Sequence, residues 1–315
     1  MAGLRGRALI AYLLVCVVWG STYLAIRIGV ADLPPVLFAG ARFFAAGILL
    51  GGAVLATGGK LPRSAREWRI LGIGGTFLLV GGNAIVVWAE QTMPSGLASV
   101  YVAAGPLWTA LFDALVPGGK TRLTWKMGLG LLAGFLGICL LSGVTPSQLF
   151  STEMRGPIAL TLAAASWAMG SVYTKRNTTS VSIYSAATVQ MTVAGAVLLI
   201  LGLALDEAKA WHFTSAAAGS LAYLILIGSL VGYTAFGYAL RHASATIVGT
   251  FAYVNPVVAV LLGWMILHEV VTARTLIAMG VILGAVLWIQ LTSSSAVKAE
   301  PSRTRVAEDK KRMTA

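Results

Sequence analysis

The segment Gly20-Ser21-Thr22-Tyr23, inside a long apolar run, returns 150 residues later as Gly170-Ser171-Val172-Tyr173. Two further pairs share this offset: Pro106 with Pro256, and the row Gly130-x-x-x-Gly134 with Gly280-x-x-x-Gly284. One coincidence of small residues would mean little in an apolar, glycine-rich chain. Three matches in register on different segments indicate an internal duplication.

The composition of the chain identifies its solvent as lipid. Of 315 residues, 57% are hydrophobic and 11% are charged, and the mean hydropathy is +0.83. A soluble domain this apolar could not cover itself with polar surface. Segments of about 20 residues, long enough to cross a bilayer, can be placed at 9–29, 35–56, 69–89, 95–116, 124–143, 156–175, 182–203, 217–239, 244–267 and 273–292. The expected fold is an all-α polytopic membrane protein with ten transmembrane helices.

The duplication predicts how these helices are arranged. Each copy holds five helices, an odd number, so the second copy enters the membrane from the opposite side. Secondary transporters use such inverted repeats to alternate access to a site near the midplane. We expect the first repeat over residues 1–148, the second over 149–292, and a disordered basic tail over 293–315.

Lysine and arginine are distributed unevenly between the two sides of this topology. All but five of the 23 lie at the ends and loops that share a side with the N-terminus; the exceptions are Arg27, Arg42, Arg155, Lys209 and Arg274. Short basic loops stay in the cytoplasm, so both termini are expected there, in a bacterial inner membrane. The formal net charge of +12 is thereby interpreted as an orientation signal, and no nucleic-acid partner is expected.

Two prolines are predicted to break the fourth and ninth helices near their middles. Pro106 and Pro256 each lack a backbone donor and free a carbonyl one turn earlier, at Val102 and Ala252. In lipid such a carbonyl needs a partner or a cavity. The pair therefore indicates cavity lining or gating, with two packing kinks as the alternative.

The glycine rows predict a contact between the fifth and tenth helices. Small residues four apart let two helix backbones approach closely in a membrane. Because Gly130 and Gly134 are the repeat equivalents of Gly280 and Gly284, we expect these two helices to pack against each other.

Aromatic side chains near the centres of the spans are candidates for a substrate site. Helical spacing groups Trp19 with Thr22 and Tyr23, Trp167 with Ser171, and Tyr101 with Trp108. Such faces would suit aromatic or amphiphilic solutes through stacking and cation–π attraction, and ordinary helix packing is the alternative. The intramembrane amides either join helices or touch substrate. The predicted substrate-binding set is Trp19, Thr22, Tyr23, Asn83, Tyr101, Trp108, Trp167, Ser171, Tyr233, Tyr253 and Asn255.

Charged residues inside the membrane are few. Arg42 lies within the second span, and Glu90 closes the third. Intramembrane charges tend to be functional, so Arg42 is a candidate for binding a substrate carboxylate or for gating; snorkelling or an ion pair with Glu90 is the alternative. No carboxylate occupies the middle of a span, which argues against a built-in proton-coupling acid and favours facilitated diffusion or another coupling route.

No arrangement of catalytic or metal-binding residues is present in the spans. Membrane-embedded hydrolases and transferases need clustered carboxylates, Ser/His or paired Asp, whereas His212, His242 and His268 all lie at span ends. We expect no enzymatic activity, no cofactor and no metal. The expected partners are a small-molecule substrate and the lipid bilayer, with the monomer as the functional unit.

Five motifs carry a resemblance to a known family: Val18-Trp19-Gly20-Ser21-Thr22-Tyr23, Pro34-Pro35, Arg42-Phe43, Pro94-Ser95-Gly96 and Tyr253-Val254-Asn255-Pro256-Val257. Over roughly residues 10–292 the chain resembles an EamA-type member of the drug/metabolite transporter superfamily. The resemblance implies ten helices, cytoplasmic termini, a central cavity between helices 1 to 4 and 6 to 9, and helices 5 and 10 outside it.

The resemblance also implies a function. YddG-type exporters of this family move amino acids and related metabolites outward, so export of small amphiphilic metabolites by alternating access is expected, with aromatic or hydrophobic amino acids favoured. Efflux of cationic drugs or other metabolites is the alternative, and a channel is a further one. The four-helix multidrug relatives carry an essential acid in their first helix. Its absence here puts proton-driven drug antiport in doubt.

Overall fold

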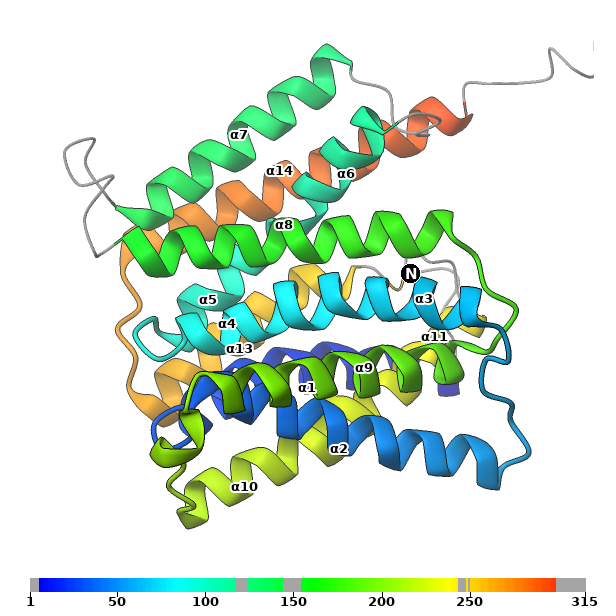
Figure 1. Cartoon of the computed structure of the whole chain (residues 1–315). Coiled ribbons are helices and arrows are strands. Elements are labelled where there is room, and N and C mark those ends of the chain that lie inside the picture. Colours follow the sequence, from blue (N-terminus) through cyan, green and yellow to red (C-terminus); the bar gives the residue numbers. More distant parts are fainter. Residues whose placement is uncertain (1–5, 117–123, 144–153, 243–247, 249, 299–315) are drawn as a thin grey trace, which may run out of the picture.

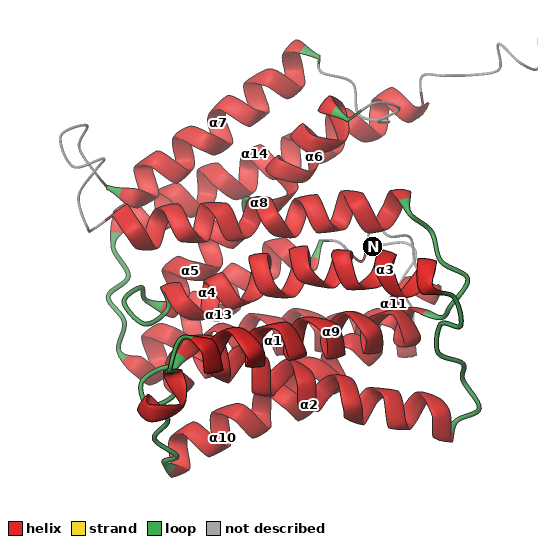
Figure 2. Ribbon diagram, in the orientation of Figure 1, coloured by secondary structure: helices red, strands yellow, loops and turns green. Residues whose placement is uncertain are grey.

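The computed structural model describes residues 6–116, 124–143, 154–242, 248 and 250–298, and these form helices and connections with no β-strand among them. In chain order the helices are α1 (Arg7–Gly29), α2 (Pro35–Ala56), α3 (Ala65–Gly75), η1 (Thr76–Ala84), α4 (Ile85–Ala89), α5 (Ser95–Val102), α6 (Gly105–Leu115), α7 (Trp125–Ser142), α8 (Arg155–Arg176), α9 (Ile183–Ala204), η4 (Glu207–Ala210), α10 (Ser215–Tyr223), η5 (Leu224–Val231), α11 (Gly232–His242), α13 (Phe251–Leu267) and α14 (Ala273–Lys298). Figures 1 and 2 show the long helices running roughly alongside one another.

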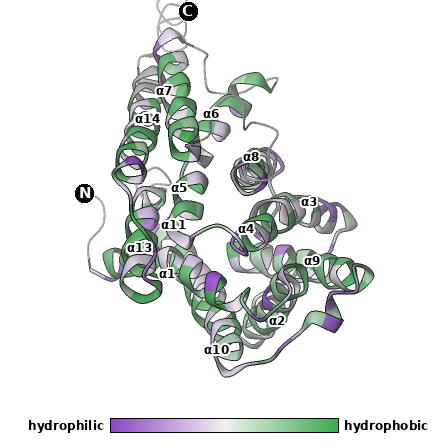
Figure 3. Ribbon diagram, turned by 90° about the vertical axis from the view of Figure 1, so that its left-hand side faces the viewer, coloured by the Kyte–Doolittle hydropathy of each residue, from purple (hydrophilic) through white to green (hydrophobic). Residues whose placement is uncertain are grey.

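The helices are long and apolar enough for a membrane. Within the described ranges, seven meet the length and hydropathy of a span, and two shorter apolar segments, Phe251–Leu267 and Ala273–Ile289, lie in the last third of the chain. Large apolar side chains such as Leu132, Ile200 and Trp264 are exposed on the outside of the bundle, at 57%, 69% and 56%. In the view along the helices, most of the ribbon has the colour of hydrophobic residues (Figure 3). Only lipid makes such a surface favourable, so the chain is a polytopic membrane protein.

Helix starts follow local sequence. Ser64, Thr124, Ser182 and Thr214 each accept a hydrogen bond from the backbone N–H three residues on, as N-cap residues do. Pro34-Pro35 begins α2, where a missing N–H has no cost. These signals explain why the observed helices begin within a few residues of the predicted spans.

Packing between the halves is reciprocal. The first helix of the N-terminal half, α1, packs on α13, α11 and α10 of the C-terminal half. The first helix of the C-terminal half, α8, packs on η1, α4, α5 and α6 of the N-terminal half. The second helices, α2 and α9, pack on each other. The two halves therefore bury their apolar faces against each other instead of each forming a core alone.

The predicted contact between the fifth and tenth helices is confirmed, because α7 and α14 lie side by side (Figure 3). A Cβ added at Gly130 would lie 2.6 Å from Ile289 of α14, so this glycine is needed for close approach. Gly134 instead faces Leu107 of α6, and Gly280 and Gly284 have no neighbour within 4 Å of such a Cβ. The interface uses only part of the glycine pattern.

The two prolines behave differently. Before Pro106 the chain leaves the helix at Ala103–Ala104, which separates α5 from α6, so the predicted break in the fourth span is confirmed. No break occurs at Pro256, which lies inside the continuous helix α13, near its N-terminal end. A proline removes one hydrogen bond of the ladder, and the helix continues because the bonds on either side remain.

Two boundaries also differ from the prediction. Helix α14 runs to Lys298, beyond the expected end at 292, and residues 299–315 of the predicted tail lie outside the described residues. The predicted boundary between the repeats, 148/149, also lies outside them.

Candidate functional site

Arg42 of α2 is the centre of the candidate site. Its side chain is only 4% exposed, although it carries a permanent charge. Its Nε donates to Ser229 Oγ of η5 and its Nη1 to Asn83 Oδ1 of η1, both at 3.4 Å. Its guanidinium also lies 4.7 Å from the centre of the Phe43 ring. Within the part of the chain that the structure describes, these two long bonds are the hydrogen bonds of its side chain, so a guanidinium with five N–H donors keeps unused capacity to donate.

Arg42 lies between matching positions of the two halves. Asn83 and Tyr233 are 150 residues apart, the offset of the repeat, and both act on Arg42: Asn83 through its hydrogen bond and Tyr233 through space. Arg42 itself matches Thr192, so the charge is supplied by one half alone. The site therefore has corresponding segments of both halves on its two sides and a positive charge that the first half alone supplies.

The two segments that hold the partners of Arg42, η1 and η5, form the walls of the site, and both are π-helical. The segments η1 and η5 occupy corresponding positions in the third spans of the two halves, and π-helical turns recur at functional sites. One carbonyl in each segment accepts a bond from the first helix of the other half. Trp19 Nε1 donates to Gly228 O at 3.1 Å, and Ser166 Oγ donates to Phe77 O at 2.8 Å. These bonds join α1 to η5 and α8 to η1, and Gly228 lies against Arg42, whose Nη2 is 3.5 Å from a Cβ added there.

An aromatic cluster adjoins the arginine. Trp19 packs on Tyr233, Phe236 and Phe251, with ring centres 5.4, 5.1 and 4.9 Å apart. Trp167, its counterpart in the second half, packs over Gly82, next to Asn83. The structure thus brings together Arg42, Asn83, Trp19, Tyr233 and Trp167.

Several predicted site residues make local contacts around this centre. Thr22 Oγ1 donates to Trp19 O and Ser171 Oγ to Trp167 O, each within its own helix. Asn255, with its amide oriented to satisfy both bonds, donates to Phe251 O and to Cys16 O of α1. These bonds favour the alternative in which Asn255 joins two helices instead of contacting substrate.

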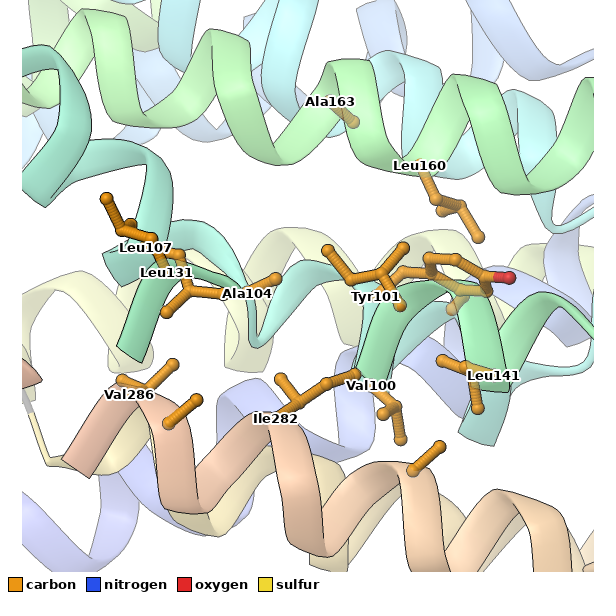
Figure 4. Packing of buried hydrophobic residues seen from close by; sticks show 14 of the residues in the cluster. Val100, Tyr101, Ala104, Leu107, Leu131, Leu141, Leu160, Ala163, Ile282 and Val286 are labelled. Carbon is orange, nitrogen blue, oxygen red and sulfur yellow. The ribbon is translucent and has the colours of Figure 1, made fainter. Parts of the chain in front are cut away.

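Tyr101 of α5 and Trp108 of α6 lie on separate helices, because the chain breaks between them, and both are turned toward α7. Tyr101 hydroxyl pairs with Ser142 Oγ at 2.7 Å, and Trp108 packs edge-on against Phe135. In Figure 4 Tyr101 lies in an apolar cluster with Leu160 and Ile282. The structure does not bring this pair to Arg42, because α7 covers both side chains.

Tyr23 and Tyr253 pack against the same apolar cluster as Tyr101, and Glu90 lies nearby at the end of α4, wholly buried. The ion pair between Arg42 and Glu90, one of the alternatives to a functional Arg42, is absent among the described residues, where neither carboxyl oxygen of Glu90 has a hydrogen-bond partner. Sequence reasoning missed Ser229 and Gly228. Neither residue type carries a sequence signal of its own, because a serine and a glycine in an apolar run are common in membrane helices.

Comparison with known proteins identifies the family. The model of the EamA-like transporter family matches the chain twice, over residues 6–143 and 154–291. The chain belongs to the EamA-like transporter family. The double match also shows that the duplication inferred from the sequence is a duplication of the EamA unit.

Relatives of this EamA-type chain carry transporter names. An inner membrane transporter of Escherichia coli K12, YedA, is 39% identical over 276 residues, covering 87% of this chain and 88% of its own. A probable amino-acid metabolite efflux pump of Salmonella typhimurium is 28% identical and covers 89% and 93%. A probable terminal-alkyne amino-acid exporter of Streptantibioticus cattleyicolor is 27% identical and covers 84% and 86%.

A solved crystal structure shares the EamA-type fold of this chain. It superposes with a TM-score of 0.65 at 23% identity, covering 93% of this chain and 99% of the other. At that identity the likeness shows the fold alone.

Proposed function

We propose that this membrane transporter exports small amphiphilic metabolites that carry a carboxylate, with aromatic or hydrophobic amino acids favoured. The observation that carries the proposal is Arg42, buried beside the Trp19 cluster with donors to spare among the described residues. A guanidinium recognises a carboxylate through parallel N–H bonds, and the aromatic rings would pack on an apolar side chain. The names of two relatives support outward movement of amino acids.

We infer alternating access between two inverted five-helix repeats, ten spans in all. The reciprocal packing of α1 and α8, each on the other half, supports this arrangement. Arg42 is closed off by its neighbours, so a solute reaches it only when the halves separate on one side. The central cavity is thus a property of the opened states. The distribution of lysine and arginine supports cytoplasmic termini, and a site built from one chain is compatible with a functional monomer.

The test is counterflow of labelled phenylalanine in proteoliposomes that hold the full-length chain. A carrier shows faster uptake of label when unlabelled phenylalanine is inside, whereas a channel shows no such stimulation. Phenethylamine, which lacks the carboxylate, should compete much less well than phenylalanine. Equal competition by the amine would favour the efflux of organic cations instead.

Variants of Arg42 test whether this side chain binds the carboxylate of the substrate. A hydrogen bond to a charged group contributes about 1.5 to 3 kcal/mol, so Arg42→Gln should weaken the apparent affinity for phenylalanine on the order of 10- to 100-fold. Lys126→Gln is the matched control, because it removes a positive charge from an exposed helix end. Equal affinities in the two variants would refute the role of Arg42.

A further inference from the structure

Glu90 is the first residue after the third span and has no exposed surface. Within the described part of the chain, neither of its carboxyl oxygens has a hydrogen-bond partner. The nearby guanidinium of Arg27 is engaged elsewhere: its Nη1 donates to the backbone carbonyls of Glu90 and Gln91. An isolated carboxylate withdrawn from water is far more costly than a neutral carboxyl group.

Two other glutamates at the same end of the bundle are held quite differently. Glu207 accepts from the backbone N–H groups of Val36 and Leu37 at the start of α2. Glu269 accepts from those of Ser95 and Gly96 at the start of α5. Both are helix N-terminal anchors, where a negative charge is stabilised. Glu90 lies instead at the C-terminal end of α4, where the helix dipole disfavours a negative charge.

The charged and titratable groups that act on Glu90 come from three elements. Burial raises the pKa of Glu90, and Glu269 raises it further, whereas Arg27 of α1 and Arg42 of α2 oppose the shift. Tyr23 of α1 also lies within electrostatic range. Helix α8 also packs on α4. The charged residue at the start of α8, Arg155, is exposed and is not among the groups that act on Glu90.

We propose that Glu90 is a proton-binding site of the transporter, protonated while the outer ends of the helices are closed and exchanging its proton with water when they open. A proton-binding acid is ordinarily expected in the middle of a span, where this chain has none. The structure supplies an equivalent environment at the end of a span, because α1, α2 and the segment after α13 cover it.

Proton binding at Glu90 is linked to the charge of Arg42. An ionised Glu90 competes with any other anion for the field of Arg42, and protonation removes that competitor. A proton on Glu90 and a carboxylate beside Arg42 therefore favour each other. This coupling rests on the proposed function: when the outer ends open, the carboxylate and the proton leave the site together, and Glu90 regains its proton from the same outer water before the ends close.

The proton site can be tested without any substrate. Infrared difference spectra of the full-length chain in nanodiscs at neutral pH should show the stretching band of a protonated carboxyl group, shifted by deuterium exchange. Glu90→Gln should abolish this band, and Glu207→Gln, which removes a carboxylate bonded to backbone N–H groups, should retain it. A band of full intensity in Glu90→Gln would overturn the proposal.

The coupling is tested by counterflow of labelled phenylalanine at several pH values. In the wild type the apparent affinity should fall with rising pH, by up to about tenfold for each pH unit above the titration of Glu90. In Glu90→Gln the affinity should no longer depend on pH in this range, and retention of the wild-type profile would overturn the coupling. If phenylalanine is not transported at all, the proposed function fails for this solute, while the infrared band still decides the proton site.

Discussion

Trp19 of α1 lies directly against Gly232 of α11, so that a Cβ at position 232 would overlap the indole nitrogen. The matching glycine of the other half, Gly82, lies against Trp167, with 3.1 Å between the added Cβ and Trp167 Cε3. In each case the tryptophan of one half rests on the glycine of the other. These two contacts flank Arg42 and fix how closely the first helix of each half approaches the π-helical wall of the opposite half.

Gly232→Ala should therefore disturb the site. The indole of Trp19 would have to move and lose its hydrogen bond to Gly228 O, and overpacking of this kind costs about 1 to 3 kcal/mol. Thermal unfolding in detergent should occur at a lower temperature, and phenylalanine counterflow should slow. Gly219→Ala is the matched control, because no atom lies within 4 Å of its added Cβ and alanine favours a helix. If the two variants behave alike, the contact has no structural role.

The contribution of the Trp19 indole hydrogen bond can be measured separately from the contribution of the aromatic ring. Trp19→Phe removes the donor to Gly228 O and leaves an aromatic ring in the cluster, so a buried carbonyl loses its partner at a cost of about 1 to 3 kcal/mol. Trp288→Phe removes a similar bond, from Nε1 to Lys126 O at 2.9 Å, far from Arg42. We expect both variants to fold and only Trp19→Phe to slow counterflow. Slowing of equal size in both would assign the effect to general destabilisation.

The fold was largely predictable because its signals are local or repeated. Apolar runs and their breakers place the helices, and the offset of 150 residues relates Asn83 to Tyr233 at the walls of the site. Helical spacing groups Tyr101 with Trp108 on one helix face, whereas the break at Ala103–Ala104 puts them on separate helices, α5 and α6. Both contact α7, a neighbour that helical spacing does not reveal.

Other features depend on tertiary packing and left no local signal. A π-helical turn has the same apolar composition as an α-helical one, so η1 and η5 could not be read from periodicity. Glu90 follows an apolar run and would ordinarily be solvated at the membrane surface. Its burial depends on residues far away in the sequence, among them Arg27, Arg42 and Glu269.

Glu269 should act as an anchor between the halves. Its carboxylate accepts from Ser95 N at 2.7 Å and Gly96 N at 3.0 Å, and so holds the segment after α13 on the start of α5. Loss of a capping carboxylate costs about 0.5 to 2 kcal/mol, so Glu269→Gln should lower the unfolding temperature and speed hydrogen exchange in the first turn of α5. Glu67→Gln is the control, since Glu67 makes the same kind of contact with Ser180 at an exposed site. Unchanged exchange in Glu269→Gln would contradict an anchoring role.

The buried carboxyl of Glu90 should make stability depend on pH. Its pKa is raised in the folded protein by burial, whereas in the unfolded chain it is near the ordinary value of about 4.3. The folded state then binds more protons than the unfolded state above pH 4.3, so this group's contribution to stability is fully present below that pH. It is lost as the pH rises toward the folded pKa, by at most about 1.4 kcal/mol per pH unit. Unfolding temperatures of the wild type should fall over this window, and Glu90→Gln, which carries no titrating proton, should show a flatter profile. Glu207→Gln should keep the wild-type slope, and parallel profiles in all three proteins would show that Glu90 is ionised in the folded state.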